Sequence, residues 1–326
     1  MSGEIIALLT TLCWSIGIFP FTEAAKRFGS STLNQYRLLL AWLILFAILV
    51  MFYGISVVKL FTLPHLNNYL YLGLSGIVGF TIGDFFTFNS FKMLGPKLSS
   101  LYTTFAPGAS LLVGYLVLNE KINGIGVCGI FVTVAGVIWL TRSKSDKSES
   151  VKAGFERSLK GALFGIAGAL CQGTGLVLSK LGMQNIQGEH LLTMHAVWIR
   201  LMFAFAGAFV FSIIKGKFKE NARSIFQNQN NGLPYLMAGT LFGPVVGVTL
   251  SLVAIQSIPV AAAQTIFALL PIVVLPLNYF YYGEKITAQA LLACLIAVVG
   301  VMILIWRDRL LQWIKKKGYR KNIART

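Results

Sequence analysis

Charged side chains are scarce in this chain. Of its 326 residues, 12% are charged and 56% are hydrophobic, whereas a soluble domain has about 25% and about 45 to 50%. This composition argues against a soluble globular protein. Runs of about twenty apolar residues match the helix length needed to cross a hydrocarbon core about 30 Å thick, so we expect a membrane protein. Outer-membrane barrels are excluded, because their strands alternate apolar and polar residues and these runs are apolar on every face.

The sequence also lacks the residue clusters of common enzymes. Its three histidines form no HExxH motif, and no Walker A stretch is present, which excludes ATP drive within this chain. Four cysteines lie inside apolar runs without CxxC spacing, and we interpret them as packing thiols. The sequence therefore predicts no metal, no cofactor and no enzyme. The histidines and cysteines are His65, His190, His195, Cys13, Cys128, Cys171 and Cys294.

Acidic residues are few, 11 against 28 Lys and Arg, which gives a net charge of +17. In a soluble protein this charge would suggest a nucleic-acid partner. Here the basic residues occupy loops and above all the segment from Arg307 to Arg325, where Asp308 is the only acid. Such residues beside a membrane span are expected at anionic lipid headgroups. We therefore predict membrane lipids as partners and no nucleic acid.

The chain contains a stretch that occurs twice. Residues 107–122 read PGASLLVGYLVLNEKI and residues 271–286 read PIVVLPLNYFYYGEKI, so the copies are offset by 164 residues. The same offset brings one GxxxG pair onto another, and offsets of 163 and 158 match further residues upstream. The chain is therefore predicted to consist of two copies of a unit of about 150 residues. The matched residues are Gly79 with Gly243, Gly83 with Gly247, Arg37 with Arg200, Cys13 with Cys171 and Gly17 with Gly175.

Ten apolar runs predict an all-α integral membrane protein with ten transmembrane helices. Five lie in residues 1–141 and five in residues 161–306, separated by a polar linker, residues 142–160, and followed by a basic tail, residues 307–326. Because five is odd, the second copy must enter the membrane from the opposite side, so the repeats are predicted to be inverted. Inverted repeats place a site near the midplane and give alternating access. The runs are 5–21, 33–53, 69–91, 98–118, 125–140, 162–178, 191–214, 233–255, 260–282 and 288–306.

The chain resembles the EamA-type branch of the drug/metabolite transporter superfamily. The ten spans in two halves, the segments TFAPGAS and FALLPIV, and the stretch that ends in Glu-Lys-Ile are similar to that family. The resemblance implies a ten-helix inverted-repeat carrier in the inner (plasma) membrane, with both termini cytoplasmic. It also implies transport of small metabolites such as amino acids or their analogues, while relatives also move sugars, nucleotide sugars and drugs. One departure is Asn119, where glycine is expected, and asparagine tolerates a positive φ.

The loop charges do not settle the orientation. With a cytoplasmic N-terminus, the opposite side would carry more Lys and Arg than the cytoplasmic side, which the positive-inside rule disfavours. The basic tail, in contrast, favours a cytoplasmic C-terminus, and with ten spans the N-terminus would then be cytoplasmic as well. The two indications conflict, so the charge pattern leaves the orientation open.

Asp84 is the strongest candidate for a functional residue. It is the one carboxylate well inside an apolar run, and its repeat position is Val248, so the fold does not require an acid there. An acid at the bilayer centre costs about 2.5 to 3.5 kcal/mol and indicates a functional site. We predict that Asp84 contacts the substrate or a proton. The alternative is a structural hydrogen bond to a neighbouring helix.

Other candidates share the helical face of Asp84 or lie in other spans. On a helix, Thr81 and Phe88 share its face, which suits an amphipathic ligand, cationic or zwitterionic. The alternatives are phenylalanines that face lipid and hydroxyls that bond their own helix. Two prolines at matching depth remove backbone hydrogen bonds and are predicted hinges, or else static kinks. The predicted substrate residues in other spans are Trp14, Tyr102, Gln172 and Gln264, and the predicted hinges are Pro107 and Pro271.

Three further matched pairs are interpreted as structural. The GxxxG pairs predict close helix packing. Arg37 and Arg200 are candidates for binding an anionic substrate, but we interpret them as snorkelling to headgroups. Glu120 and Glu284 end their spans beside lysines and are interpreted as solvated cap or gate pairs.

The sequence thus predicts a secondary active transporter, an exporter of small organic metabolites or drugs that works by alternating access. We expect a small-molecule substrate, protons as a candidate coupling ion, and a monomer or homodimer. The alternatives are an intramembrane enzyme and a non-transporting membrane sensor or subunit. A repeat does not by itself prove transport.

Overall fold

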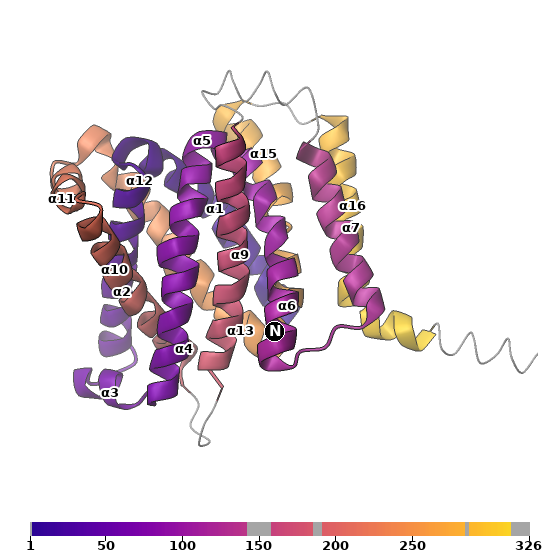
Figure 1. Cartoon of the computed structure of the whole chain (residues 1–326), viewed down its shortest axis with the longest axis horizontal. Helices are drawn as coiled ribbons and strands as arrows, with labels where there is room; N and C mark the ends of the chain where they lie inside the picture. The colour runs from indigo at the N-terminus through magenta and orange to yellow at the C-terminus, as the bar shows by residue number, and fades with distance from the viewer. Residues whose placement is uncertain (1, 142–157, 185–190, 284–286, 314–326) are drawn as a thin grey trace, which may run out of the picture.

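A computed structural model of the chain describes residues 2–141, 158–184, 191–283 and 287–313. These residues form helices and no strand, as Figure 1 shows. Eight helical segments are long and apolar enough to cross a membrane, and the bent pair Leu291–Ile303 and Arg307–Trp313 would make nine. The prediction of an all-helical membrane protein is therefore confirmed, whereas the number ten is not settled by helix length and composition.

The first half runs from α1 to α7. Its first two spans are α1 Gly3–Phe28 and α2 Ser30–Met51. The third span consists of α4 Leu66–Gly76, η1 Ile77–Gly83 and the part of α5 Asp84–Tyr102 up to Gly95. The fourth span contains the rest of α5, η2 Thr103–Phe105 and α6 Ala106–Leu118, and α7 Gly124–Thr141 follows it. Gly95, with φ 79° and ψ 170°, separates the third and fourth spans within α5. The short helix α3 Val57–Thr62 lies between the second and third spans.

The second half repeats this order. It begins with α9 Leu159–Gly182 and α10 Thr193–Ile214. The eighth span consists of α12 Leu233–Thr240, η4 Leu241–Gly247 and α13 Val248–Ser257. The ninth span consists of α14 Val260–Phe267 and α15 Leu270–Tyr282, and α16 Ala288–Ile305 follows it. The short helices α11 Phe218–Phe226 and η3 Gln229–Asn231 lie between α10 and α12. In Figure 1, α1 begins at the lower end of the bundle and α9 at the upper end, so corresponding helices run in opposite directions.

The two halves share their irregularities, residue for residue. Both η1 and η4 are π-helices of seven residues, and their bounds differ by the repeat offset. The same offset relates α6 to α15, and each ends at a residue in the left-handed region, Asn119 at φ 53° and Gly283 at φ 69°. Asn119 therefore adopts the positive φ expected of it from the sequence. A π-helix is rare and needs support from its surroundings, so its occurrence twice reflects matched packing.

The packing between the halves follows the repeat as well. Helix α1 packs on η4 and α13, while its counterpart α9 packs on η1 and α5. Likewise α2 packs on α10, α7 on α16, and α6 on α14. In Figure 1, α7 and α16 form a pair to one side of the other helices. Each half therefore buries its inner faces largely against the other half.

Glycines bring the paired helices close together, which confirms the packing role predicted for the GxxxG pairs. A Cβ atom added at Gly175 of α9 would lie 2.9 Å from the Cα atom of Gly79 in η1. One added at Gly83 would lie 2.9 Å from the Cβ atom of Cys171. The matched contact in the other half is looser, because a Cβ atom at Gly17 of α1 would lie 3.5 Å from the backbone nitrogen of Gly243.

This difference generates a prediction for two matched glycines. Gly175→Ala is expected to destabilise the protein by about 1 to 3 kcal/mol, because the added methyl group overpacks a backbone contact. Gly17→Ala is expected to leave stability unchanged or slightly raised, because its contact distance is ordinary and alanine favours helix. Thermal unfolding of both variants in the same detergent measures this. Equal midpoints for the two variants would contradict it.

Candidate functional site

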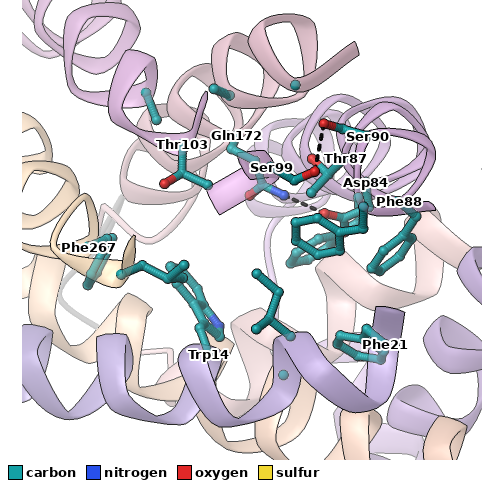
Figure 2. A pocket seen from close by; sticks show the side chains of 18 of the residues that line it. Trp14, Phe21, Asp84, Thr87, Phe88, Ser90, Ser99, Thr103, Gln172 and Phe267 are labelled. Atoms are coloured by element: carbon teal, nitrogen blue, oxygen red, sulfur yellow. Dashed lines mark hydrogen bonds between the residues drawn. The ribbon is translucent and has the colours of Figure 1, made fainter. Parts of the chain in front are cut away.

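A cavity of about 140 Å³ lies between the two halves. One ordered water needs at least about 10 to 15 Å³, so the cavity has room for several waters or a small organic group. Figure 2 shows its walls, with Trp14 and Phe267 on one side and Asp84, Thr87 and Gln172 on another. The lining residues come from α1, α2, the third, fourth, eighth and ninth spans, and α9. The cavity therefore depends on both halves.

Aromatic rings form much of the wall. The rings of Trp14 and Phe267 meet edge to face with centroids 5.0 Å apart, and those of Phe21 and Phe88 lie 5.3 Å apart. Polar groups interrupt this surface at a few points. Ser90 donates to Ser99 over 3.0 Å across the turn between the third and fourth spans. A mostly apolar cavity with a few placed polar groups is typical of small-molecule sites.

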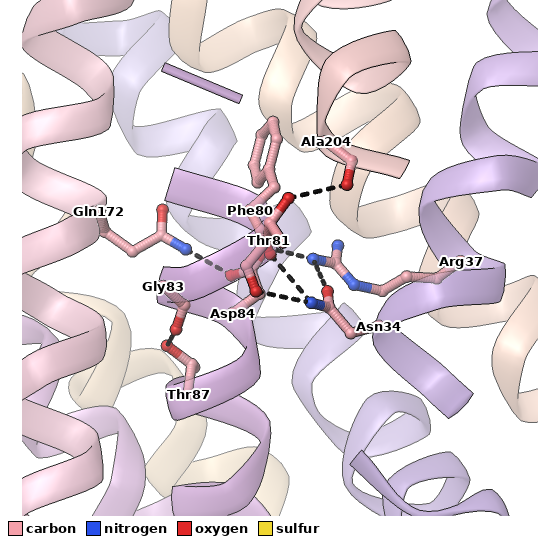
Figure 3. A network of polar contacts seen from close by, with 9 residues as sticks. All are labelled: Asn34, Arg37, Phe80, Thr81, Gly83, Asp84, Thr87, Gln172 and Ala204. Atoms are coloured by element: carbon pink, nitrogen blue, oxygen red, sulfur yellow. Dashed lines mark hydrogen bonds and ion pairs between the residues drawn. The ribbon is translucent and has the colours of Figure 1, made fainter. Parts of the chain in front are cut away.

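Asp84 occupies the polar side of the cavity. It follows the π-helix η1 at the start of α5 and is 6% exposed. Its Oδ2 atom forms an ion pair and hydrogen bond with Nη2 of Arg37, and its Oδ1 atom accepts a hydrogen bond of 2.5 Å from Nε2 of Gln172 (Figure 3). Arg37 belongs to α2 and Gln172 to α9. The carboxylate thus joins one helix of its own half to one helix of the other.

Asn34 supports this arrangement from α2. Its Oδ1 atom accepts from Nη2 of Arg37 over 3.1 Å, and its Nδ2 atom donates to the backbone oxygens of Phe80 and Thr81 over 3.0 and 3.1 Å. Both oxygens belong to the π-helix, as Figure 3 shows. The hydroxyl of Thr81 donates to the backbone oxygen of Ala204 in α10 over 2.8 Å. These bonds fix the irregular backbone that positions Asp84.

The interpretation of Arg37 and Arg200 as snorkelling residues is wrong. Both residues are 3% exposed, and each lies about two turns inside its helix. Arg200 donates from Nε to Oγ of Ser75 over 3.0 Å, and its guanidinium carbon lies 4.5 Å from the ring centre of Phe80. Partners within the bundle hold both side chains, so neither needs to reach the headgroups. The signal that could have found them was their recurrence at matched positions in both halves.

The cavity brings together most of the predicted substrate residues. Asp84, Phe88, Trp14, Gln172 and Gln264 all line it. It adds residues that the sequence did not single out, because the turn at Gly95 is needed to bring the third and fourth spans face to face. These are Ser90 and Ser99.

Two predicted substrate residues lie elsewhere. Thr81 is turned toward α10, to which it donates its hydrogen bond. Tyr102 packs beside Leu94 and Leu98 and against Gly165 of α9, where an added Cβ atom would lie 2.8 Å from the Cβ atom of Tyr102. Neither side chain lines the cavity. Sequence spacing shows which residues share one face of a helix, but it does not show which neighbouring helix that face contacts.

The predicted hinges Pro107 and Pro271 each lie in the first turn of a helix, α6 and α15. Proline is tolerated there, since the first N–H groups of a helix lack intrahelical partners. A short irregular segment precedes each, η2 in one half and residues 268–269 in the other. The fourth and ninth spans are therefore broken at matching depth, and hinge motion at these breaks stays a prediction.

Glu120 forms an ion pair at one end of the bundle. Its Oε1 atom lies 2.8 Å from Nζ of Lys180, and its Oε2 atom accepts from the backbone N–H of Val260 over 2.9 Å. Lys180 also donates to the backbone oxygen of Ile258 over 3.0 Å. These contacts, which we call the Glu120 clasp, join α6 of one half to α9 and the turn before α14 of the other. Glu284, its counterpart in the repeat, lies outside the described residues.

The repeat does not provide a second clasp of the same kind. By the offsets of 158 and 164, Thr22 corresponds to Lys180 and Pro96 to Val260. Threonine carries no charge, and proline has no backbone N–H to donate. The contacts made by the charge of Lys180 and by the N–H of Val260 therefore have no counterpart at Thr22 and Pro96.

The fold is that of a multi-pass membrane protein, and sequence comparison gives the family. The profile of the EamA-like transporter family matches residues 1–142 and 159–306. The chain therefore belongs to this family, within the drug/metabolite transporter superfamily.

Individual relatives agree with this assignment. An "Uncharacterized transporter" of Clostridium kluyveri is 24% identical over 306 residues, 92% of each chain. The "Multidrug resistance protein EbrB" of Bacillus subtilis is 37% identical over 83 residues, which are 24% of this chain and 69% of that protein. A solved structure with 16% sequence identity superposes with a TM-score of 0.62 over 95% of this chain and 98% of its own, which supports the fold.

The ion pair at the cavity generates a second prediction. Arg37→Met or Asp84→Leu alone is expected to destabilise the protein by about 3 to 5 kcal/mol, because each leaves an unpaired buried charge. The double variant is expected to recover most of that loss. The free energies of unfolding of the wild type, the two single variants and the double variant, measured in detergent, give the coupling energy between Arg37 and Asp84.

A matched control is the ion pair between Lys26 and Glu23, 3.3 Å apart with the lysine side chain 32% exposed. Lys26→Met is expected to cost at most about 1 kcal/mol, since solvent screens the pair. If Arg37→Met were as mild as this control, Arg37 and Asp84 would not form the constraint described.

Proposed function

We propose that this protein is a secondary active carrier that exports a small organic metabolite, such as an amino acid or an analogue, or a drug. The observation that carries the proposal is the cavity built from both halves with a buried carboxylate in its wall. In an inverted-repeat carrier, the site lies where matching helices meet, and movement of one half against the other exposes it to each side in turn. The mostly aromatic wall, with few polar groups, suits a small organic solute.

The substrate would contact Asp84, Gln172, Gln264, Phe88 and Trp14, which all line the cavity. Asp84 has a second role in this proposal. Since it joins α2 of one half to α9 of the other, a proton or ligand that changes these bonds changes the contact between the halves. A carboxylate in such a position is a candidate proton carrier. Alternating access then follows from the same residue that contacts the solute.

The Glu120 clasp supports a cavity that is shut at one end. It joins α6 to α9 and to the turn before α14 with an ion pair and two backbone hydrogen bonds. The side chains of Lys180 and Glu120 are 21% and 15% exposed, so solvent reaches the pair in part. A pair of this kind is strong enough to favour one state and weak enough to break during transport.

Flux into liposomes tests the proposal. Purified protein in liposomes is screened with a panel of metabolites, with and without a pH gradient, and wild type is compared with Asp84→Asn. We expect gradient-driven flux of at least one solute in the wild type. If Asp84 carries the proton, Asp84→Asn loses uphill transport but keeps exchange of solute, because the amide cannot release a proton.

Several outcomes would count against the proposal. Unchanged uphill transport in Asp84→Asn would remove Asp84 from proton coupling. Absence of flux for every solute would favour a sensor or a subunit of another system over a carrier.

The clasp generates a further prediction. Glu120→Gln is expected to raise the population of the conformer that is open at the clasped end about fivefold. This corresponds to the loss of about 1 kcal/mol from a partly exposed ion pair. The measurement is the labelling rate, with a water-soluble maleimide, of a cysteine placed at Gln264 in a chain without its four native cysteines. Lys121→Gln is the control, because it removes a neighbouring exposed cation that is not part of the clasp. Equal labelling rates in both variants would show that the clasp does not govern access.

A further inference from the structure

The buried charges of the described residues do not balance. Three buried side chains carry a formal charge at neutral pH, the cations Arg37 and Arg200 and the anion Asp84. Each is at most 6% exposed. The centre of the bundle therefore holds one positive charge more than it holds negative charge.

Both oxygens of Asp84 already have a partner. One of its oxygens pairs with Arg37 and the other accepts from Gln172. A cationic ligand would have to displace Arg37 or share its carboxylate. The contacts of Asp84 with Arg37 and Gln172 therefore disfavour the cationic or zwitterionic ligand that the sequence suggested for this helix face.

Arg200 has no carboxylate of its own. Its Nε atom donates to a serine hydroxyl, whereas its Nη1 atom is buried without a hydrogen-bond partner among the described residues. In the first half, Asp84 offsets the charge of Arg37. The residue that corresponds to Asp84 in the second half is Val248, which is 5% exposed and lines the cavity. The chain thus keeps both arginines of the repeat and only one acid.

The ring of Phe80 lines the cavity and contacts both arginines, although Arg200 itself does not line the cavity. The guanidinium carbons of Arg37 and Arg200 lie 6.0 and 4.5 Å from the centre of its ring, and both Phe80 and Arg37 line the cavity. Cation–π contact with this ring stabilises the arginines in part. It does not neutralise them, since a guanidinium keeps its proton in protein interiors. An uncompensated charge in a low-dielectric region is costly, and it raises the electrostatic potential of a nearby cavity.

We propose that the cavity binds a small organic monoanion, a carboxylate, whose charge offsets the excess charge of the two arginines. This proposal rests on the carrier function proposed above and restricts its substrates to monoanions, which excludes zwitterionic amino acids. The carboxylate would lie on the polar side, near Arg37 and the amides of Gln172 and Gln264. The apolar part of the solute would lie against the wall that contains Trp14 and Phe267.

Four solutes with similar four-carbon skeletons separate charge from shape. Butyrate is an anion, butyramide is neutral, 2-aminobutyrate is a zwitterion and butylammonium is a cation. Binding to purified wild-type protein is measured by equilibrium dialysis of each labelled compound at neutral pH, in the same low-salt buffer without any other organic carboxylate. We expect butyrate to bind about tenfold or more tightly than butyramide, because its hydrogen bonds involve charged groups. Butylammonium is expected to bind most weakly.

Variants of Arg200 identify the source of the preference. Arg200→Gln removes the excess charge and is expected to bring butyrate and butyramide within about twofold of each other, whereas Arg200→Lys keeps the preference because it keeps the charge. Arg223→Gln, on the exposed face of α11, is the control for a general loss of positive charge. The solute series on wild type stands by itself if Arg200→Gln does not fold.

The outcomes separate this proposal from the carrier function. Equal or tighter binding of butylammonium, 2-aminobutyrate or butyramide, or no binding of any of the four, overturns the monoanion site. Anion-selective binding without flux of butyrate, or of any metabolite in the liposome screen, supports the site and contradicts the carrier. Gradient-driven flux of cations alone supports the carrier and contradicts the site.

Discussion

The ion pair between Asp84 and Arg37 is the constraint on which the rest of the site depends. A carboxylate in the middle of a membrane bundle needs partners, and here they come from α2 and, through Gln172, from α9. Asn34 links the same arginine to the carbonyl groups of a π-helix. Local backbone irregularity, the contact between halves and the polar wall of the cavity are therefore one connected arrangement.

The repeat explains why this arrangement is possible and where it departs from symmetry. Matched π-helices, matched helix breaks and matched glycines give both halves the same packing surfaces. The chemistry is distributed unequally over that shared frame. Asp84 corresponds to Val248, and Gln172 corresponds to Trp14, so one wall of the cavity is polar and the opposite wall is largely aromatic.

The sequence predicted the fold well because hydrophobic run length and an internal repeat are properties of the chain itself. It also singled out Asp84, Gln172 and Trp14, which line the cavity, since an acid inside an apolar run and a matched pair of Gln172 and Trp14 stand out against apolar runs. It failed for Arg37 and Arg200, because an arginine near the start of a span fits either headgroups or a buried partner. Tyr102 was misjudged and Ser99 was missed for a related reason, since the turn at Gly95 decides which faces of the third and fourth spans meet.

The one-sided clasp at Glu120 has a consequence for the energy of the two end states of a carrier. If the two halves were identical, the inward-open and outward-open conformers of such a carrier would contain the same contacts and would have equal free energies. Lys180 and the N–H of Val260 have no equivalents at Thr22 and Pro96, so that equality is lost. In the proposed carrier, these few side chains on a nearly symmetric frame would give one conformer a resting preference, and exchanging them between the halves would reverse it.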